Sequence, residues 1–224
     1  MDDQPPMKIA VVPVTPFQQN CSILWCTATM KGAVVDPGGE VDRILATAQQ
    51  HGVSLEKVIV THGHLDHCGS AGVLADRLGI PVEGPQREDE FWITDLERQG
   101  QNYGFTEART FAPTRWLEDG DTVTVGDLSL DILHCPGHTP GHVVLFHEPS
   151  RFAVVGDVLF KGSIGRSDLP RGNGAQLVRS IRDKLWPLGE DVTFLPGHGE
   201  LSTFGHERKV NPFVSDMALA MWED

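Results

Sequence analysis

The chain has 224 residues, of which 40% are hydrophobic and 22% are charged, a balance typical of a soluble globular protein. Its formal net charge of −13 argues against binding to nucleic acid or to anionic membranes, because both need clustered Lys and Arg. No stretch approaches the roughly 18 apolar residues of a membrane-spanning helix. The acidic N-terminus does not resemble a signal peptide, and the four cysteines include no CxxC pair, so we expect a cytoplasmic protein.

The first part of the chain alternates between strand and helix patterns. Three runs rich in strand-forming residues predict strands at residues 8–14, 21–29 and 32–35. Apolar residues then recur at helical spacing between Val41 and Ala48, and His51-Gly52 ends that helix. A buried strand is predicted at 58–60, and a second helix at 71–78.

Residues 84–118 differ in character from the rest. A helix is expected over 88–98, followed by a polar, glycine-rich stretch at 99–105 that carries interspersed aromatic residues. Phe111 and Trp116 follow. The segment predicts either a substrate lid with apolar contacts or a surface excursion whose aromatic residues cover the core.

The last part of the chain repeats the mixture of strands and helices. Strands are predicted at 123–125, 128–133, 143–146, 152–155 and 192–195, with a hairpin turn at Gly126-Asp127. A helix is predicted to follow Gly174 and to end at Trp186-Pro187. Periodicity alone therefore indicates an α/β or α+β fold.

The densest chemistry lies directly after the strand at 58–60. His62, His64, Asp66 and His67 fall within six residues. In an extended backbone alternate side chains share one face, so His62 and His64 are placed to bind one metal ion. Asp66 and His67 are adjacent and diverge, which predicts a second ion. The alternative is a surface histidine cluster without a specific ion.

Three more candidate ligands stand between or after predicted strands. They are His138 in a Pro- and Gly-rich loop, Asp157 after Val155-Gly156, and His198 in Pro196-Gly197-His198-Gly199. The two oxygens of a carboxylate at Asp157 can contact two cations, which a histidine cannot. Together these positions predict a metal centre made from strand ends.

The H-x-H-x-D-H pattern at 62–67 resembles the signature of the metallo-β-lactamase superfamily. Residues 156–160, 165–168 and 197–199, together with Glu207-Arg208 and Asn211-Pro212, are similar to glyoxalase II and its short single-domain relatives. This resemblance implies one domain over 1–224, folded as a four-layer αββα sandwich of two mixed β-sheets. It also implies the ligand sets, which are His62, His64 and His138 for one ion, Asp66, His67 and His198 for the other, and Asp157 for both.

The implied activity is hydrolysis of a thioester by a hydroxide that bridges two divalent ions, with Asp66 orienting that hydroxide. Zinc is the expected metal, and iron or manganese are the alternatives. The resemblance suggests S-D-lactoylglutathione as substrate. A thiol leaves without protonation, and no dedicated acid stands out beside the ligands, which also favours thioesters over lactams.

The sequence departs from glyoxalase II in its substrate contacts. The family's C-terminal helical domain has no counterpart after Pro212, and Tyr103 is the only tyrosine. The family's Lys-x-Tyr is replaced by Arg166-Ser167-Asp168. Arg166 is therefore the candidate substrate-binding residue for a small thioester, with glutathione-derived thioesters among the candidates and a surface salt bridge as the alternative.

Three rival functions remain open from the sequence. A persulfide dioxygenase-like oxidoreductase would use one iron on His62, His138 and Asp157, leaving His64, His67 and His198 either idle or as partners that orient the ligands. A lactone or ester hydrolase of the same fold is the second rival. A metal-binding protein without catalysis is the third.

The remaining polar residues receive simpler interpretations. His142 is a candidate partner that orients a ligand, and Asp36 is interpreted as a turn former rather than such a partner. Surface or satisfied core positions are expected for His51, His134, His147 and His206, and buried filler positions for Cys68 and Cys135.

Overall fold

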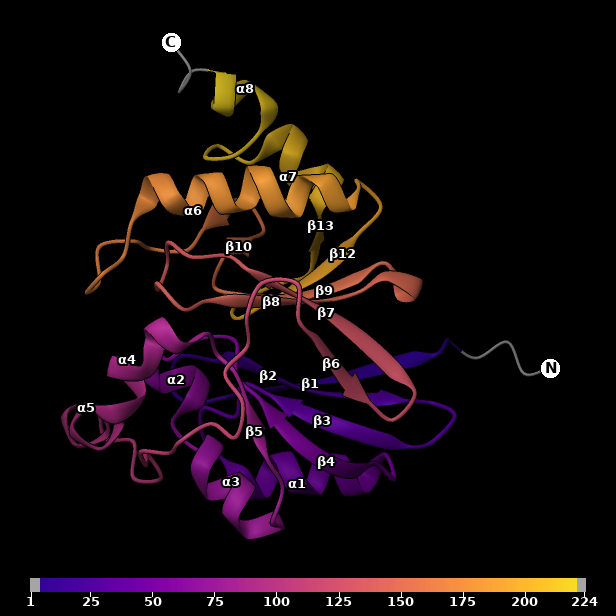
Figure 1. The fold of residues 1–224 in the computed structure, drawn as a ribbon, viewed down its shortest axis with the longest axis vertical. Helices are drawn as coiled ribbons and strands as arrows, with labels where there is room; N and C mark the ends of the chain where they lie inside the picture. Colours follow the sequence, from indigo (N-terminus) through magenta and orange to yellow (C-terminus); the bar gives the residue numbers. More distant parts are fainter. Residues whose placement is uncertain (1–4, 221–224) are drawn as a thin grey trace.

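Two mixed sheets face each other in the computed structural model, which describes residues 5–220 (Figure 1). The first sheet has the order β1 (Met7–Val14), β2 (Gln19–Cys26), β3 (Lys31–Val35), β4 (Ser54–Ile59) and β5 (Val82–Glu83). β1, β2 and β3 pair antiparallel, whereas β3, β4 and β5 run parallel. Parallel pairing needs crossover connections, and the helices after β3 and β4 supply them.

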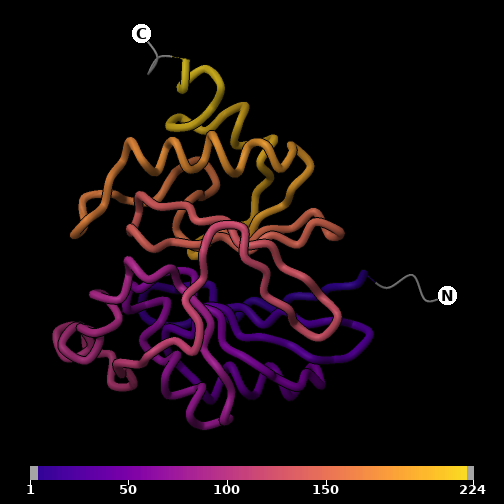
Figure 2. Tube along the Cα trace, in the orientation of Figure 1, coloured from indigo at the N-terminus to yellow at the C-terminus, as the bar shows by residue number. Residues whose placement is uncertain are grey.

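The second sheet is formed by the later part of the chain. Its order is β13 (Ser202–Thr203), β12 (Thr193–Pro196), β9 (Phe152–Gly156), β8 (Val143–His147), β7 (Leu128–His134) and β6 (Thr122–Val125). Only β12 and β9 pair in parallel. A separate two-stranded ribbon joins β10 (Leu159–Phe160) to β11 (Ser163–Ile164). The colours of Figure 2 show that the first sheet belongs to the early chain and the second sheet to the later chain.

Helices cover the outer face of each sheet. α1 (Val41–Gln50) and α3 (Ala71–Leu78) lie below the first sheet, and α6 (Gly174–Ser180) lies above the second (Figure 1). α6 continues through a π-helical turn and a 3₁₀ turn as far as Leu188. α7 (Phe204–Val210) and α8 (Asp216–Ala220) complete the upper layer. The predicted four-layer αββα sandwich is confirmed.

Three hydrophobic clusters fill the spaces between these layers. Leu24 and Ile59 pack with Leu130 and Leu145 between the two sheets. Ile23, the neighbour of Leu24, points the other way and packs in the cluster that includes α1 and α3. This alternation is the two-residue repeat of a strand buried on both faces. The third cluster joins the second sheet to α6 and α7.

Most predicted elements are confirmed within a few residues, but the region after residue 87 differs. The helix expected over 88–98 is divided into a 3₁₀ turn at Arg87–Asp89, α4 (Glu90–Thr94) and α5 (Leu96–Tyr103). The expected end of the helix at residue 98 was wrong, because α5 continues to Tyr103. Its polar sequence buries only a narrow stripe, and Gly104 ends it with a left-handed φ of 75°.

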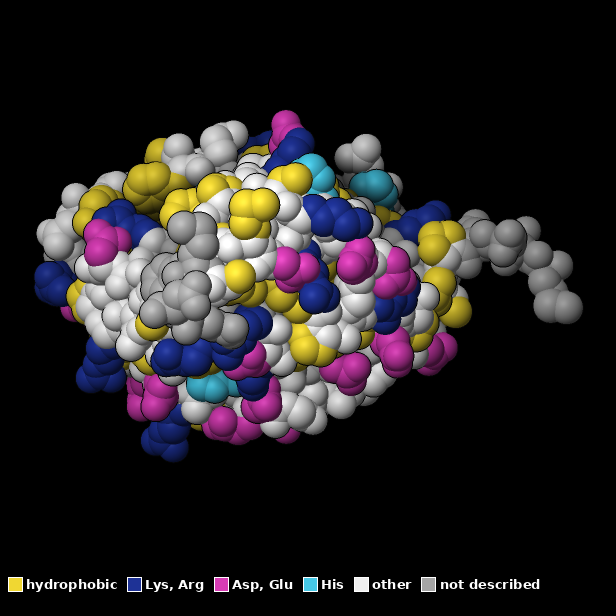
Figure 3. All heavy atoms as spheres, turned by 90° about the horizontal axis from the view of Figure 1, so that it is seen from above, with side chains coloured by type: hydrophobic (Ala, Val, Ile, Leu, Met, Phe, Trp, Pro, Cys, Tyr) yellow, Lys and Arg dark blue, Asp and Glu magenta, His cyan; other side chains and the backbone are white. Residues whose placement is uncertain are grey.

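The outer surface carries mixed charge. Figure 3 shows basic and acidic side chains interspersed with apolar ones on the face above α6 and α8. Within residues 5–220, no helix combines the length and the apolar character needed to cross a bilayer.

Candidate metal centre

Strand ends bring the predicted ligands together. β4 leads into the histidine motif, which continues into the short helix α2 (Leu65–Cys68). His138 follows β7, Asp157 follows β9, and His198 follows β12. His64 has an extended backbone just before α2, which explains why His62 and His64 share a face while Asp66 and His67 turn away from it.

The first cluster consists of three histidines. Nδ1 of His64 lies 3.1 Å from Nε2 of His62 and 2.9 Å from Nε2 of His138. Burial, followed by the neighbouring imidazoles, holds the pKa of His62 well below its usual value and lowers that of His64 to about 3. All three rings are buried. Neutral imidazoles whose nitrogens converge on one point are the donor set that a divalent cation needs.

The second cluster contains Asp66, His67 and His198. Nε2 of His198 lies 3.1 Å from Oδ2 of Asp66 and 3.4 Å from Nε2 of His67. Burial alone would lower the pKa of His67, but Asp157 and Asp66 outweigh it and raise that pKa well above its usual value. This cluster therefore attracts positive charge, which a proton or a metal ion can supply.

Asp157 lies between the two clusters. Its Oδ1 is 3.3 Å from Nε2 of His67, and its Oδ2 is 3.6 Å from Nε2 of His138. Burial opposes ionisation, but His67 and His138 hold the pKa of Asp157 well below its usual range. A buried, ionised carboxylate between two groups of ring nitrogens fits two cations. The His and Asp clusters are thus consistent with a dinuclear metal site.

The outward-facing nitrogen of four of these rings has a partner of its own. The Nδ1 partners are the Thr61 hydroxyl for His62 at 3.1 Å, Asp36 for His67 at 2.9 Å, the Arg166 carbonyl for His138 at 2.7 Å and the Phe17 carbonyl for His198 at 3.1 Å. Such partners fix the tautomer and the orientation of each ring.

Asp36 has a larger role than the sequence indicated. Its backbone has a left-handed φ of 53°, as a turn former would. Its carboxylate, however, accepts hydrogen bonds from the backbone N–H and the hydroxyl of Thr61 at 2.7 and 2.6 Å, and it contacts His67. The interpretation of Asp36 as a turn former alone was therefore wrong. With His62 and His67, Asp36 forms a third group of possible ligands, but its oxygens already serve as acceptors for Thr61.

His142 behaves as the predicted partner of a ligand. Its Nε2 accepts a hydrogen bond from the backbone N–H of Asp157 at 3.0 Å, and its ring stacks on His62 at 4.6 Å. Burial holds its pKa well below the usual value, so the neutral ring can accept that bond.

Asp89 is a buried residue near the centre that the sequence did not reveal. Its carboxylate accepts hydrogen bonds from the two loops that carry His62, His64 and His138. Its charged neighbours Glu88 and Glu90 gave it the pattern of an exposed helix start, and no spacing signal linked it to the metal motif.

A cleft of about 550 Å³ opens onto both clusters. Its remaining lining includes the apolar or aromatic residues Phe17, Leu65, Trp92, Tyr103 and Leu169, together with Gln99 and Arg166. The 84–118 segment therefore supplies part of the cleft wall through α4 and α5. Phe111 and Trp116, in contrast, pack against the hydrophobic core, as the second alternative expects, and a role of the segment as a substrate lid stays a prediction.

Arg166 lines the cleft, but its guanidinium is engaged elsewhere. Its Nε and Nη2 donate to the carboxylate of Asp168, each at 2.8 Å, and both side chains are exposed. The salt bridge considered from the sequence is therefore present. Substrate binding by Arg166 stays a prediction.

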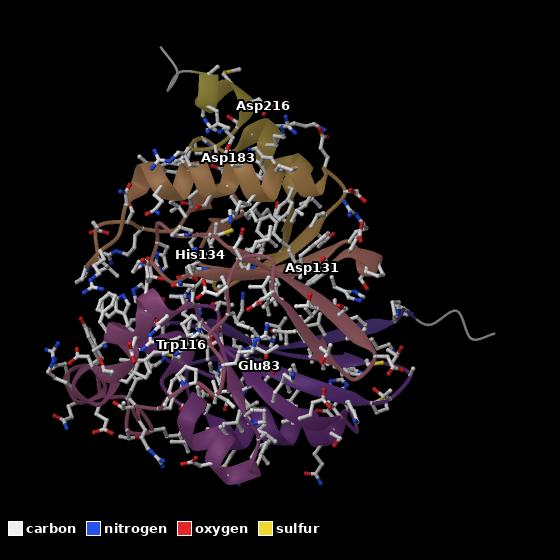
Figure 4. All side chains as sticks on the ribbon, in the orientation of Figure 1. Glu83, Trp116, Asp131, His134, Asp183 and Asp216 are labelled. Carbon is white, nitrogen blue, oxygen red and sulfur yellow. The ribbon has the colours of Figure 1, made fainter. Side chains whose placement is uncertain are left out.

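The histidines and cysteines interpreted as surface, core or filler residues lie outside the clusters. His134, labelled in Figure 4, sits on the second sheet with Nε2 at 2.8 Å from the carbonyl of Pro140. Nδ1 of His147 contacts the Ser150 hydroxyl at 2.8 Å. Cys68 and Cys135 are fully buried, and burial raises the pKa of the Cys135 thiol to about 12. Their interpretation as buried fillers is confirmed.

Known proteins share both the sequence and the fold of this chain. A hydroxyacylglutathione hydrolase, GloC, from Haemophilus influenzae is 40% identical over 93% of this chain and 99% of its own length. The crystal structure of the B3 metallo-beta-lactamase BLEG-1 is 30% identical, with a TM-score of 0.84 over 92% of this chain and 99% of its own. TTHA1623, crystallised in a di-iron-bound form, is 31% identical, with a TM-score of 0.81 over 92% of this chain and 100% of its own.

The sequence profile of the metallo-beta-lactamase superfamily matches residues 14–198, a range that contains both clusters. The chain therefore belongs to the metallo-β-lactamase superfamily.

Proposed function

We propose that this chain is a dinuclear metal-dependent hydrolase that cleaves thioesters, with S-D-lactoylglutathione as the first substrate to test. The observation that carries the proposal is the contact of Asp157 with both histidine clusters, at 3.3 Å to His67 and 3.6 Å to His138. The 40% identity to a hydroxyacylglutathione hydrolase supports the choice of substrate.

In this proposal each cluster would hold one ion, and Asp157 would contribute a carboxylate oxygen to each site. The assigned ligands are His62, His64 and His138 for the first ion, and Asp66, His67 and His198 for the second. Nitrogen and carboxylate donors suit zinc, and iron or manganese are accepted by the same ligands. When bound, the two cations supply a hydroxide at neutral pH and polarise the substrate carbonyl.

The chain's own side chains position the substrate and the nucleophile. Asp66 lies beside both His198 and His67, where its carboxylate can accept a hydrogen bond from the attacking hydroxide and keep it oriented. Phe17, Leu65 and Trp92 give the cleft an apolar wall that limits competing water. The thiolate leaving group departs without a proton, so the cleft needs no separate acid.

The second cluster favours a centre with two metal ions over a centre with one. A mononuclear dioxygenase on His62, His138 and Asp157 would have no use for Asp66, His67 and His198. Yet His67 and His198 meet Asp66 in one cluster, and their outer nitrogens are held by Asp36 and the Phe17 carbonyl. Fixing these side chains costs conformational entropy, and a site that binds no ion would offer no metal bonds to offset that cost.

A substrate panel tests the proposal. It contains S-D-lactoylglutathione, a thioester without glutathione, a lactone, a cephalosporin and glutathione persulfide with oxygen uptake recorded. We expect kcat/KM for one of the two thioesters to exceed that for the lactone and the cephalosporin by at least tenfold, and activity to disappear after chelation. Preferential lactam or lactone hydrolysis, or oxygen uptake with one iron per chain, would contradict the proposal.

A further inference from the structure

The carboxylate of Asp89 is completely buried and accepts three hydrogen bonds. Its Oδ2 accepts from the backbone N–H of Gly63 at 2.8 Å and from the hydroxyl of Thr139 at 2.7 Å. Its Oδ1 accepts from the backbone N–H of Gly141 at 2.6 Å. Both oxygens thus accept hydrogen bonds from groups of the two metal-binding loops.

These donors adjoin every ligand of the first cluster. Gly63 stands between His62 and His64, and Thr139 directly follows His138. One carboxylate therefore connects the loop after β4 to the loop after β7. The hydrogen bonds of Asp89 include none to Asp66, His67, Asp157 or His198.

The backbone around Asp89 packs directly against the same loops. A Cβ added at Gly63 would lie 2.7 Å from Cβ of Trp92, and one added at Gly141 would lie 2.6 Å from the nitrogen of Asp89. The N–H of Gln86 also donates to the carbonyl of Gly141 at 2.9 Å. This close packing requires glycine at both positions, and it makes residues 86–92 a rigid support for the two loops.

Only an ionised carboxylate satisfies all three donors. An asparagine offers one oxygen, and its amide nitrogen would face either the N–H of Gly141 or the two donors at Oδ2. A buried donor left without an acceptor is unfavourable, so the loops would separate or admit water. Because the ring nitrogens of the first cluster lie only 2.9 to 3.1 Å apart, a small loop displacement would spoil their convergence.

We propose that Asp89 is a positioning residue that holds the two loops of the first cluster in register, and so sets the affinity of the first metal ion without contacting it. The inference rests on the proposed metal centre. It assigns the 86–92 part of the 84–118 segment a supporting role in addition to its place in the cleft wall.

Metal affinity measured separately at each site tests this inference. Zinc affinity is determined by competition with a chromophoric chelator in two backgrounds, His198→Ala, which retains the first cluster, and His138→Ala, which retains the second. Asp89→Asn is added to each. We expect at least a tenfold loss of affinity in the His198→Ala background and less than a threefold change in the His138→Ala background. Equal losses in both backgrounds, or no loss in either, would overturn the inference.

A second pair of variants avoids the risk that Asp89→Asn fails to fold. In the His198→Ala background, Thr139→Ser keeps the hydroxyl that Asp89 accepts, whereas Thr139→Val removes it with little change in shape. We expect Thr139→Ser to bind zinc like its parent and Thr139→Val to bind it severalfold more weakly. Equal zinc affinity for the two would overturn the inference.

Asp95→Asn serves as the matched control for the acid-to-amide change, because Asp95 pairs with Arg98 on the surface of the same segment. We expect it to leave zinc affinity unchanged, and a loss equal to that of Asp89→Asn would count against the inference. These measurements record binding rather than turnover. A wild-type chain that binds two ions but hydrolyses no thioester would refute the proposed function and leave the inference standing.

Discussion

Oδ2 of Asp36 lies 2.9 Å from Nδ1 of His67, although 31 positions separate the two residues. The carboxylate is fixed in turn by the N–H and the hydroxyl of Thr61, the residue that precedes the histidine motif. Asp36 therefore couples the start of the motif to the orientation of a ring in the second cluster.

Replacing Asp36 by alanine is expected to weaken metal binding at the second cluster by about 10- to 100-fold, because His67 loses the acceptor that orients its ring. Zinc competition in the His138→Ala background measures this affinity. Asp42→Ala is the control, since the Asp42 side chain is 87% exposed and pairs with Arg77 at the surface. Unchanged affinity in Asp36→Ala would show that His67 does not depend on this contact.

Gly38 is expected to tolerate no side chain. A Cβ at Gly38 would overlap the backbone carbonyl of Asp66, whereas a Cβ at Gly39 would meet only a methyl group of Thr15 at 3.3 Å. Gly38→Ala must therefore displace α2 and with it Asp66 and His67. We expect it to reduce thioester turnover at least tenfold and Gly39→Ala to change it little, in steady-state assays at equal metal loading. Equal rates for the two variants would contradict the observed packing.

Glu207 is expected to stabilise the fold through a buried network. Its carboxylate accepts from the N–H of Gly162 at 2.8 Å, from the amide of Asn211 at 2.9 Å and from the hydroxyl of Ser202. Glu207→Ala leaves these donors unsatisfied and should lower the free energy of unfolding by about 1–3 kcal/mol. Urea denaturation of the metal-free protein measures the change. Glu200→Gln, at an exposed pair with Lys161, should have no measurable effect, and equal effects would refute the network.

Arg166 is expected to act in binding rather than in the chemical step, because it lines the cleft while its guanidinium pairs with Asp168 and not with the metal clusters. If it holds a substrate carboxylate, Arg166→Ala should raise KM for S-D-lactoylglutathione severalfold with kcat unchanged. Asp168→Asn should lower KM, because it releases the guanidinium. If steady-state kinetics give the wild-type KM for both variants, Arg166 does not bind the substrate and serves only the salt bridge with Asp168.

The positions of the candidate ligands could be singled out from the sequence because they depend on local pattern. Alternation after a buried strand places His62 and His64 on one face, and the Gly- and Pro-rich loops around His138 and His198 indicate strand ends. The family resemblance then supplied the sandwich, which periodicity alone could not distinguish from other α/β folds.

The supporting residues were not predictable in the same way. Asp89 meets Thr139 across 50 positions, and Asp36 meets Thr61 across 25, so their roles depend on tertiary contacts that no local pattern encodes. α5 was missed beyond residue 98 because Gly100 and Asn102 have weak helix propensity, and packing of Leu96 and Gln99 overrides that propensity.

The two-ion centre is tested most directly by metal content measured together with hydrolysis of S-D-lactoylglutathione, for the wild type and for His198→Ala. We predict two metal ions per chain in the wild type and a value falling towards one in the variant, with kcat reduced at least tenfold, or about 1.4 kcal/mol in activation free energy. One ion per chain in the wild type, or a variant that keeps the wild-type rate, would contradict the account.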